Sequence, residues 1–252
     1  AGALAGLAGA ALLWAVAVPH YRASAVIAPA NPMNGAHMAS AMEHDQRFAP
    51  LNFLLQRVGG ANAPDFVRFE AMARGPGMAE ALLANKTVLQ GLARDKAYFW
   101  SQPPQSWNAA QFAEYLERRV EITPMPGSAL RVMKYAHPDA RFAAFLLSEI
   151  HRQTDAAIRR KTRGETLGRI AYLQAELGKA MNPEHRRALT DLLLEQERLN
   201  MLVSIDQPYA ADLIESPSPS SRPRWPDIPM AACLMVLAGM LAGFAVFGLR
   251  RA

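Results

Sequence analysis

The sequence has little cysteine, since Cys233 is the only one among 252 residues. A single thiol cannot form a disulfide within the chain, so the folded part depends on its own hydrophobic core. The sequence also contains neither G-x-S-x-G nor G-x-x-x-x-G-K-[ST]. These absences exclude the nucleophile elbow of serine hydrolases and the phosphate-binding loop of many ATP-binding proteins.

Two long segments, residues 1–18 and 228–249, lack any charged side chain. At about 1.5 Å per residue, a helix over residues 228–249 is long enough to cross the ~30 Å hydrocarbon layer, so we expect a transmembrane helix rather than a buried core helix. We expect a second such helix over residues 1–18. The alternative there is a signal peptide, because residues 15–17 form an A-x-A pattern, but no basic n-region precedes it and the apolar run is long.

The charged residues gather between these two segments. All 22 acidic residues lie there with 25 of the 27 basic ones, which leaves a net charge of +3 (25 minus 22) and predicts no nucleic-acid partner. Arg250 and Arg251 follow the second segment. Because positive flanks remain in the cytoplasm, we expect both termini to be cytoplasmic and the large loop to be periplasmic in a bacterial inner membrane.

Within the loop, hydrophobic spacing predicts helices over residues 48–58, 65–74 and 111–118, and over residues 78–98 with breaks allowed. Alternation predicts strands over residues 21–29, 119–123, 130–135 and 209–214. Residues 31–47 have no clear pattern. They contain His37, His44 and Asp45, but this spacing fits no common metal site. We therefore expect no metal, no cofactor and no catalytic residue.

The later part of the loop predicts a long antiparallel helical hairpin over residues 138–205. Pro138 is expected in the first turn of a helix that continues to about residue 180, although Gly164, Gly168 and Gly178 weaken it. Asn182 and Pro183 are typical of the cap and first turn of a second helix, which ends near residue 205. The apolar spacing predicts that the two arms meet through Ile170, Leu173 and Leu177 on one side and Leu189, Leu192, Leu199 and Val203 on the other.

A proline-rich connector precedes the second apolar segment and contains Pro217, Pro219, Pro223, Pro226 and Pro229. Each proline fixes φ and lacks an N–H donor, so we expect an extended, polyproline-like spacer that enters neither helix nor sheet. Trp225, Arg222 and Arg224 are then expected at the level of the lipid headgroups. The alternative is a flexible linker, which the serines favour.

Two further groups are candidate contact residues. Gly239 with Gly243, and Gly2 with Gly6, form G-x-x-x-G patterns that let membrane helices pack closely. The basic cluster comprises Arg159, Arg160, Lys161 and Arg163. It either contacts an acidic glycan or a lipid-linked diphosphate, or it is a solvated helix face that pairs with Glu165, Glu195 or Glu197.

The fold class expected from these patterns is an α+β membrane protein. Two transmembrane helices, residues 1–18 and 228–249, flank a periplasmic domain with a small membrane-proximal mixed sheet and a protruding helical hairpin. Residues 19–137 form the α/β base in this interpretation, residues 138–205 the hairpin, and residues 206–227 the return strand and connector.

Several stretches, taken in order, resemble one family. YRASAVIAPA follows the first apolar segment, DFVRFEAMARGPGMAEALL comes next, and ALRVMKYAHPDARFAAFLLSEI leads into the long helix, before the proline-rich run into the second apolar segment. This order resembles the Wzz-type chain-length determinants, the polysaccharide co-polymerases of the bacterial inner membrane. The loop is short for that family, and residues 31–44 match no stretch of it.

The resemblance implies a non-enzymatic protein that forms an oligomeric ring and sets the length of O-antigen, capsule or exopolysaccharide chains. It implies as partners further copies of the chain, a Wzy-type polymerase, membrane lipid and lipid-linked polysaccharide. Two alternatives remain open on sequence alone: a two-span receptor with a ligand-sensing periplasmic domain, which would need a signalling domain, and the adaptor of a polysaccharide exporter, which usually has one span.

Overall fold

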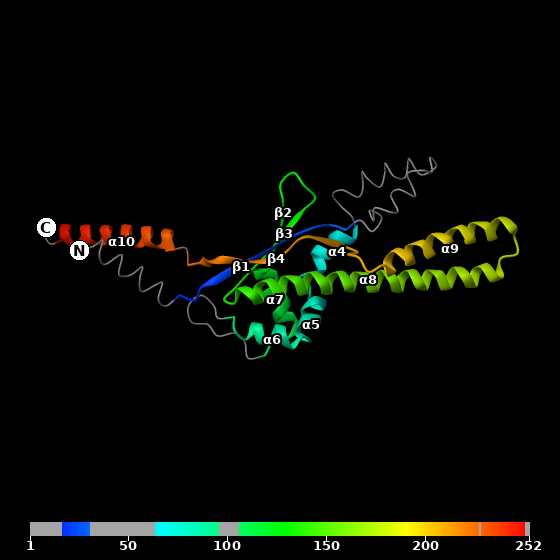
Figure 1. The fold of residues 1–252 in the computed structure, drawn as a ribbon, viewed down its shortest axis with the longest axis horizontal. Helices are drawn as coiled ribbons and strands as arrows, with labels where there is room; N and C mark the ends of the chain where they lie inside the picture. Colours follow the sequence, from blue (N-terminus) through cyan, green and yellow to red (C-terminus); the bar gives the residue numbers. More distant parts are fainter. Residues whose placement is uncertain (1–16, 31–63, 96–105, 227, 250–252) are drawn as a thin grey trace.

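A computed structural model describes residues 17–30, 64–95, 106–226 and 228–249. The molecule is elongated: helix α10 (Ile228–Leu249) lies at one end, a base of short helices and strands in the middle, and the hairpin of α8 (Ala140–Lys179) and α9 (Pro183–Ser204) at the other (Figure 1). The expectation of an α+β fold with a small sheet and long helices is confirmed. The helix expected over residues 48–58, residues 31–47 and most of segment 1–18 lie outside the described residues.

The sheet has four strands in the order β2-β3-β1-β4, namely β2 (Glu121–Pro124), β3 (Arg131–His137), β1 (His20–Pro29) and β4 (Ala211–Trp225). All three neighbouring pairs are antiparallel, so the prediction of a mixed sheet is wrong. The physical reason is the path of the chain. β1 runs away from the end that carries α10, whereas β3 and β4 both run back toward it.

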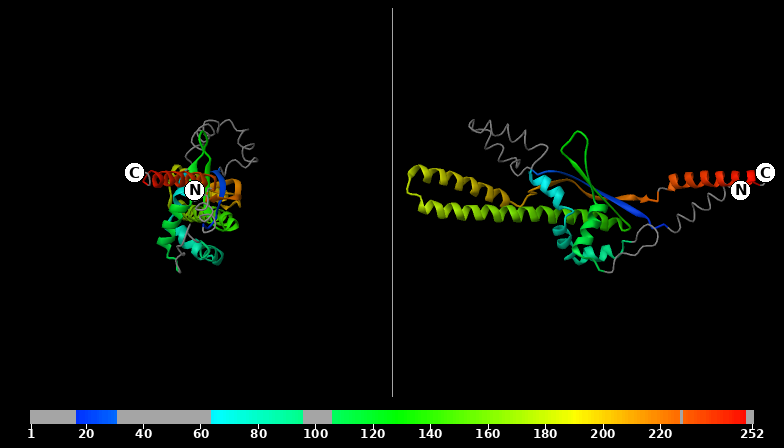
Figure 2. Two further views of the ribbon diagram at one scale, coloured as in Figure 1. Left: turned by 90° about the vertical axis from the view of Figure 1, so that its left-hand side faces the viewer. Right: turned by 180° about the vertical axis from the view of Figure 1, so that it is seen from behind.

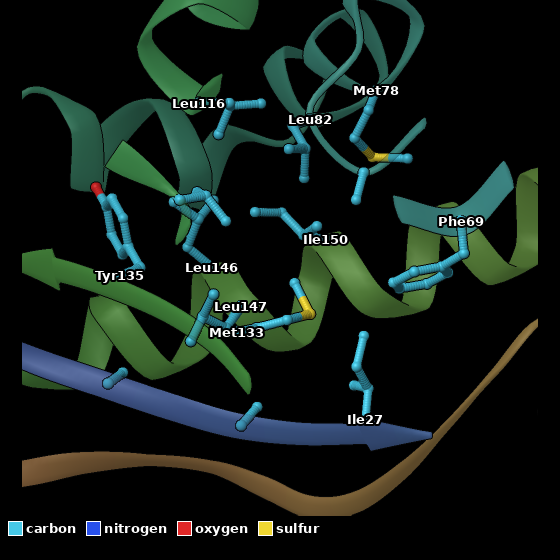
Figure 3. Close-up of a cluster of buried hydrophobic side chains, with 14 of the residues drawn as sticks. Ile27, Phe69, Met78, Leu82, Leu116, Met133, Tyr135, Leu146, Leu147 and Ile150 are labelled. Carbon is cyan, nitrogen blue, oxygen red and sulfur yellow. The ribbon is translucent and has the colours of Figure 1, made fainter. Parts of the chain in front are cut away.

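One face of the sheet is buried beneath α8 and the short helices. Along β1, Ala23, Ala25 and Ile27 are buried, and the residues between them are half-buried. Figure 3 shows Ile27 and Met133 on the strands facing α8, whose side chains fill the space above the sheet. The core includes Phe66, Phe69, Met78, Leu82, Phe112, Leu116, Met133, Tyr135, Leu146, Leu147 and Ile150.

Four short helices complete the base: α4 (Pro64–Met72), α5 (Pro76–Leu83), α6 (Lys86–Leu92) and α7 (Ala109–Arg119). The helical segment expected over residues 78–98, for which breaks were allowed, is two helices as far as the structure describes it. Asn85 separates them, because its side-chain Oδ1 accepts a hydrogen bond from the backbone N–H of Thr87 at 2.9 Å and so caps α6.

The hairpin forms as its capping residues predict, with one difference at its start. α8 is a single helix of 40 residues, and Asn182 caps α9 with Pro183 in the first turn. At the start of α8, however, the cap is Asp139, whose Oδ1 accepts from the backbone N–H groups of Arg141 (2.9 Å) and Phe142 (3.2 Å). Pro138 thus precedes the cap instead of lying in the first turn.

The proline-rich segment differs most from its expectation. Pro217, Pro219 and Pro223 lie within β4, a strand of 15 residues that pairs with β1, so the prediction that prolines exclude this segment from a sheet is wrong. β4 is an edge strand, where a residue that lacks an N–H group need not interrupt a ladder on its outer side. Register shifts along the β1–β4 pair also accommodate the extra residues of β4.

Helix α10 begins two residues after Pro226, with Pro229 in its first turn. Large apolar side chains on it are exposed, including Met230, Leu234, Leu237, Leu241 and Phe244. Among the described residues, no helix is long and apolar enough to cross a membrane.

Candidate functional site

The basic cluster expected from the sequence divides into two parts. The Arg159 guanidinium turns toward the base of the hairpin, where it pairs with Asp155 (3.3 Å) and Asp206 (3.5 Å) and donates to the backbone carbonyl of Gln207. Its partners are therefore not the glutamates that the sequence suggested. Arg160, Lys161 and Arg163 are exposed, and no described carboxylate lies within ion-pair distance of them.

Asp155 connects the hairpin to the sheet, and sequence reasoning missed it. Its Oδ1 accepts hydrogen bonds from the backbone N–H groups of Tyr209 (2.9 Å), Ala210 (2.7 Å) and Ala211 (3.4 Å), where the chain leaves α9 and enters β4. Because Asp155 is buried, this set of donors and Arg159 compensate its charge. The available sequence signal was an acidic residue within the apolar stripe of α8, four residues before an arginine.

An open pocket lies beside this junction. Asp155 and Arg159 line it together with His151, Arg152, Ala156, Arg160, Asp206, Gln207 and Pro208. The Nε2 atom of His151 lies 2.9 Å from the carbonyl of Ala211, and Arg152 pairs with Glu149 at 2.6 Å. Arg152 thereby lowers the pKa of Glu149. Arg152 and Arg159 are each paired with a carboxylate at this pocket. The pocket therefore has no strong charge of one sign, and we interpret it as a structural junction.

The described residues contain no group of three or more side chains suited to hold a metal ion. A buried polar network does lie in the base. The Tyr115 hydroxyl donates to Oδ2 of Asp95 at 2.6 Å and lies 2.6 Å from the Tyr135 hydroxyl, while Arg119 pairs with Asp95 at 3.2 Å. Burial raises the pKa of both tyrosines, and the charge of Asp95 raises that of Tyr115 further. Both hydroxyls therefore stay protonated and support packing rather than acid–base chemistry.

His137 lies next to this network, fully buried at the end of β3. Its Nδ1 is 2.9 Å from the backbone N–H of Asp139, a geometry in which the neutral ring accepts a hydrogen bond. Burial lowers the pKa of His137; the carboxylates of Asp95 and Asp139 oppose this effect, and His20 adds to it. The ring is therefore held neutral at the junction between β3 and the long helix.

The seam between α8 and α9 differs from the one expected. Spacing along α9 places Leu189, Leu193, Gln196, Asn200 and Val203 toward α8, and Gln196 and Asn200 each have a buried oxygen without a hydrogen-bond partner among the described residues. Leu192 and Leu199, expected in the seam, are instead 49% and 40% exposed, so that prediction is wrong. The helix has leucines on several sides, and more than one side fits a three-four spacing of apolar residues.

Two apolar stripes consequently face outward from α9. The first stripe consists of Leu192 and Leu199, which are seven residues apart. The second stripe consists of Leu194 and Met201, which are also seven residues apart and are 48% and 65% exposed. At 3.6 residues per turn the two stripes lie on different sides of the helix, with Asp191 and Arg198 between them. Apolar positions at these intervals are typical of helices that pack against another helix.

The remaining candidate residues lie in or near α10. Gly239 and Gly243 occur in this helix, and their four-residue spacing places them on one face. Gly2 and Gly6 lie outside the described residues. No partner for these glycines is described, so their role in helix packing stays a prediction.

Comparison with known proteins gives matches among solved structures alone. No protein-family model matches the chain, and no curated protein matches it. A full-length bacterial polysaccharide co-polymerase is similar, with 14% identity and a TM-score of 0.49, over 99% of this chain and 92% of that one. A fragment of WzzB, a polysaccharide co-polymerase from Salmonella Typhimurium, has 16% identity and a TM-score of 0.45 over 82% of this chain and 100% of that one.

A third structure is a mutant of the Shigella flexneri lipopolysaccharide O-antigen chain-length regulator WzzBSF. It has 11% identity and a TM-score of 0.33, over 81% of this chain and 99% of that one. All three structures carry the names of the family that the sequence resembles. The chain is thus similar to Wzz-type polysaccharide co-polymerases.

Proposed function

We propose that the chain is a non-enzymatic regulator of polysaccharide chain length in a bacterial inner membrane. In this proposal residues 1–18 and 228–249 span the membrane, both termini are cytoplasmic, and the base and hairpin are periplasmic. Copies of the chain form a ring that works with a Wzy-type polymerase on O-antigen, capsule or exopolysaccharide. The polysaccharide role comes from the resemblance of the sequence, and the self-association comes from α9.

The observation that carries the proposal is the pair of outward apolar stripes on α9. A solvent-exposed helix normally presents polar residues outward and apolar residues to its neighbour. Here the outward sides carry four large apolar residues, while the seam contains Gln196 and Asn200. This distribution is costly for a hairpin that stands alone in water, and it favours a helix with further helices on two sides.

Two stripes on different sides of one helix fit a head-to-tail contact, in which the first stripe of one copy packs against the second stripe of the next. Such contacts use two different surfaces, so each copy keeps a free surface until the ring closes. A contact through one shared surface would instead give a dimer. The arrangement therefore supports a closed ring over a two-fold dimer.

The test is the mass of the detergent-solubilised full chain by light scattering, corrected for detergent. A ring predicts roughly six or more copies, whereas a monomer or dimer would contradict the proposal and favour the receptor. Leu192→Gln with Leu199→Gln removes the first stripe, and Leu194→Gln with Met201→Gln removes the second. Either double variant should dissociate the ring. Arg187→Gln with Arg198→Gln, at exposed polar positions of α9, is the matched control and should assemble as the unmodified chain does.

Mixing the two stripe variants tests the head-to-tail contact directly. Each variant keeps one intact stripe, and the two intact stripes complement each other. The mixture should therefore form a one-to-one heterodimer and nothing larger, while each variant alone remains monomeric. If each stripe instead packed against the same stripe of a second molecule, no heterodimer would form in the mixture.

Function is then tested in a strain that lacks the gene. The unmodified chain should restore a defined distribution of polysaccharide lengths on a gel, and neither stripe variant should. We also propose that Arg160, Lys161 and Arg163 contact an acidic glycan or a lipid-linked diphosphate. Replacing all three with Gln should leave the ring mass unchanged and shift the length distribution. An unchanged length distribution would contradict the proposed contact.

A further inference from the structure

The end of the sheet next to α10 carries three arginines, Arg22 on β1 with Arg222 and Arg224 on β4, here called the basic collar. The register pairs Tyr21 with Pro223, so the three arginines lie beside this one pair of residues. Arg222 and Arg224 are exposed and Arg22 is half-buried. β4, which carries two of the three arginines, leads toward α10 at one end of the molecule (Figure 2).

No described carboxylate lies within ion-pair distance of the collar. The recorded contacts of these residues are made by the backbone: the N–H of Arg22 donates to the Ser220 hydroxyl at 3.2 Å, and that hydroxyl donates to the Arg222 carbonyl at 2.8 Å. Other arginines of the base, such as Arg119 and Arg131, pair with Asp95 and Glu70. Among the described residues, the collar therefore has no carboxylate that compensates its charge.

Charge along β4 is polarised in the same sense. Its acidic residues, Asp212 and Glu215, pair with Ala28 and Val26 at the end of β1 that points toward the hairpin. Its two arginines, Arg222 and Arg224, lie among the last four residues of β4, close to the start of α10. Asp227 is the one acidic residue in the sequence from residue 216 to 249, so the positive charge at this end exceeds the negative charge.

Trp225 lies beside the collar, with its ring centroid 6.3 Å from that of His20 in an edge-on arrangement. An amphipathic aromatic ring among arginines, directly before an apolar helix, is typical of the membrane–water interface. Guanidinium groups bind phosphate by paired, charge-assisted hydrogen bonds, and an arginine is weakly enough hydrated to do so at an interface.

We infer that the basic collar binds the phosphate groups of anionic phospholipids, and that the protein prefers such lipids over zwitterionic ones. The inference rests on the proposed membrane placement, because the collar meets headgroups only if α10 is embedded. Bound phosphate relieves the repulsion among the three cations and fixes the height and tilt of the sheet above the bilayer. Anionic lipid thus becomes a ligand of the base rather than only its solvent.

The experiment uses the full chain in detergent, equilibrated with equal amounts of phosphatidylglycerol and phosphatidylcholine and analysed by native mass spectrometry. Phosphatidylglycerol should be retained preferentially, and the preference should fall roughly fivefold for each collar arginine replaced by Gln. It should also weaken as salt rises. Arg22→Gln, Arg222→Gln and Arg224→Gln together should bring the two lipids to parity.

The control replaces three exposed arginines of α9, Arg186, Arg187 and Arg198, by Gln, and should keep the preference. If the triple collar variant does not fold, the single variants Arg222→Gln and Arg224→Gln on the exposed edge decide the question. Equal retention of both lipids by the unmodified chain would overturn the inference. So would a preference that survives loss of the collar.

Two further arms separate this inference from the proposed function. Competition with inorganic pyrophosphate distinguishes a headgroup at the interface from a site for free phosphate, because a headgroup site should keep its lipid when pyrophosphate is added. Alkaline extraction of membranes tests the membrane placement itself. A chain that stays in the membrane but retains both lipids equally contradicts the collar alone, whereas a chain released by extraction contradicts both proposals.

Discussion

At the scale of single residues, Gly91 is the glycine, among those that the structure describes, where an added side chain would have the least room. A Cβ atom added to Gly91 in α6 would lie 2.0 Å from the ring of Phe142 on α8, so this ring packs directly against the backbone of α6. Gly91→Ala should therefore destabilise the protein by about 1–3 kcal/mol, although alanine has the higher helix propensity.

Gly168 provides the matched comparison, because a Cβ atom there meets nothing within 4 Å. Gly168→Ala should stabilise α8 by up to about 1 kcal/mol, since only the propensity effect remains. Chemical denaturation of both variants in detergent measures the two free energies. Equal shifts for Gly91→Ala and Gly168→Ala would show that the close approach of α6 and α8 does not exist.

His137 predicts how stability depends on pH. Burial lowers its pKa below the ordinary 6.5, so between the two values the unfolded chain binds more protons than the folded one. The stability from this residue is fully present above the unfolded-state pKa of about 6.5 and is lost as the pH falls from there through the lower pKa of the folded state. The melting temperature of the full chain should therefore decrease from pH 7 to pH 5.5.

Comparing variants shows whether His137 causes the pH dependence of the melting temperature. His137→Gln removes the titrating group, so its melting temperature should vary less over this range. His185→Gln, at an exposed position in the first turn of α9, should keep the slope of the unmodified chain. Parallel profiles for all three proteins would mean that His137 does not set the dependence.

At the scale of elements, the α8–α9 seam contains a buried polar atom whose removal should stabilise the protein. The Oε1 atom of Gln196 is buried in the seam without a hydrogen-bond partner among the described residues. Gln196→Leu removes this acceptor and adds apolar contact, so it should raise stability by about 1–2 kcal/mol.

The control for the seam is Gln174→Leu, because Gln174 is exposed on α8. It should leave stability nearly unchanged and only add apolar surface. Thermal denaturation of the two variants gives the comparison, and a loss of stability in Gln196→Leu would indicate that the seam forms on another face of α9.

At the scale of the whole molecule, the G-x-x-x-G of α10 bears on assembly. If α10 spans the membrane as proposed and Gly239 and Gly243 pack closely against a second helix there, larger side chains separate the two helices. Gly239→Leu with Gly243→Leu should then shift the oligomer mass or the polysaccharide length distribution. Ala238→Leu with Ala242→Leu, at the neighbouring positions of the helix, is the comparison for added bulk. An unchanged oligomer mass together with an unchanged length distribution would contradict the predicted packing role of the glycines.

Local sequence patterns predicted the elements whose boundaries depend on neighbouring residues. Asn182 and Pro183 indicated the start of α9 because a cap acts on the N–H groups of its own first turn. Alternation in residues 21–29 and 130–135 indicated β1 and β3 for the same reason. The uninterrupted apolar composition of residues 228–249 indicated the helix α10, and reading it required no knowledge of the other elements.

The tertiary structure alone decided which partner each element takes. Several faces of α9 fit the apolar spacing, so the sequence could not distinguish Leu192 from Leu193 as the residue that faces α8. The three N–H groups bound by Asp155 lie more than 50 residues away along the chain. Pro217, Pro219 and Pro223 looked incompatible with a sheet until β4 was found at its edge. In each case the deciding interaction joins residues distant in sequence, and a local pattern carries no information about which distant surface will meet it.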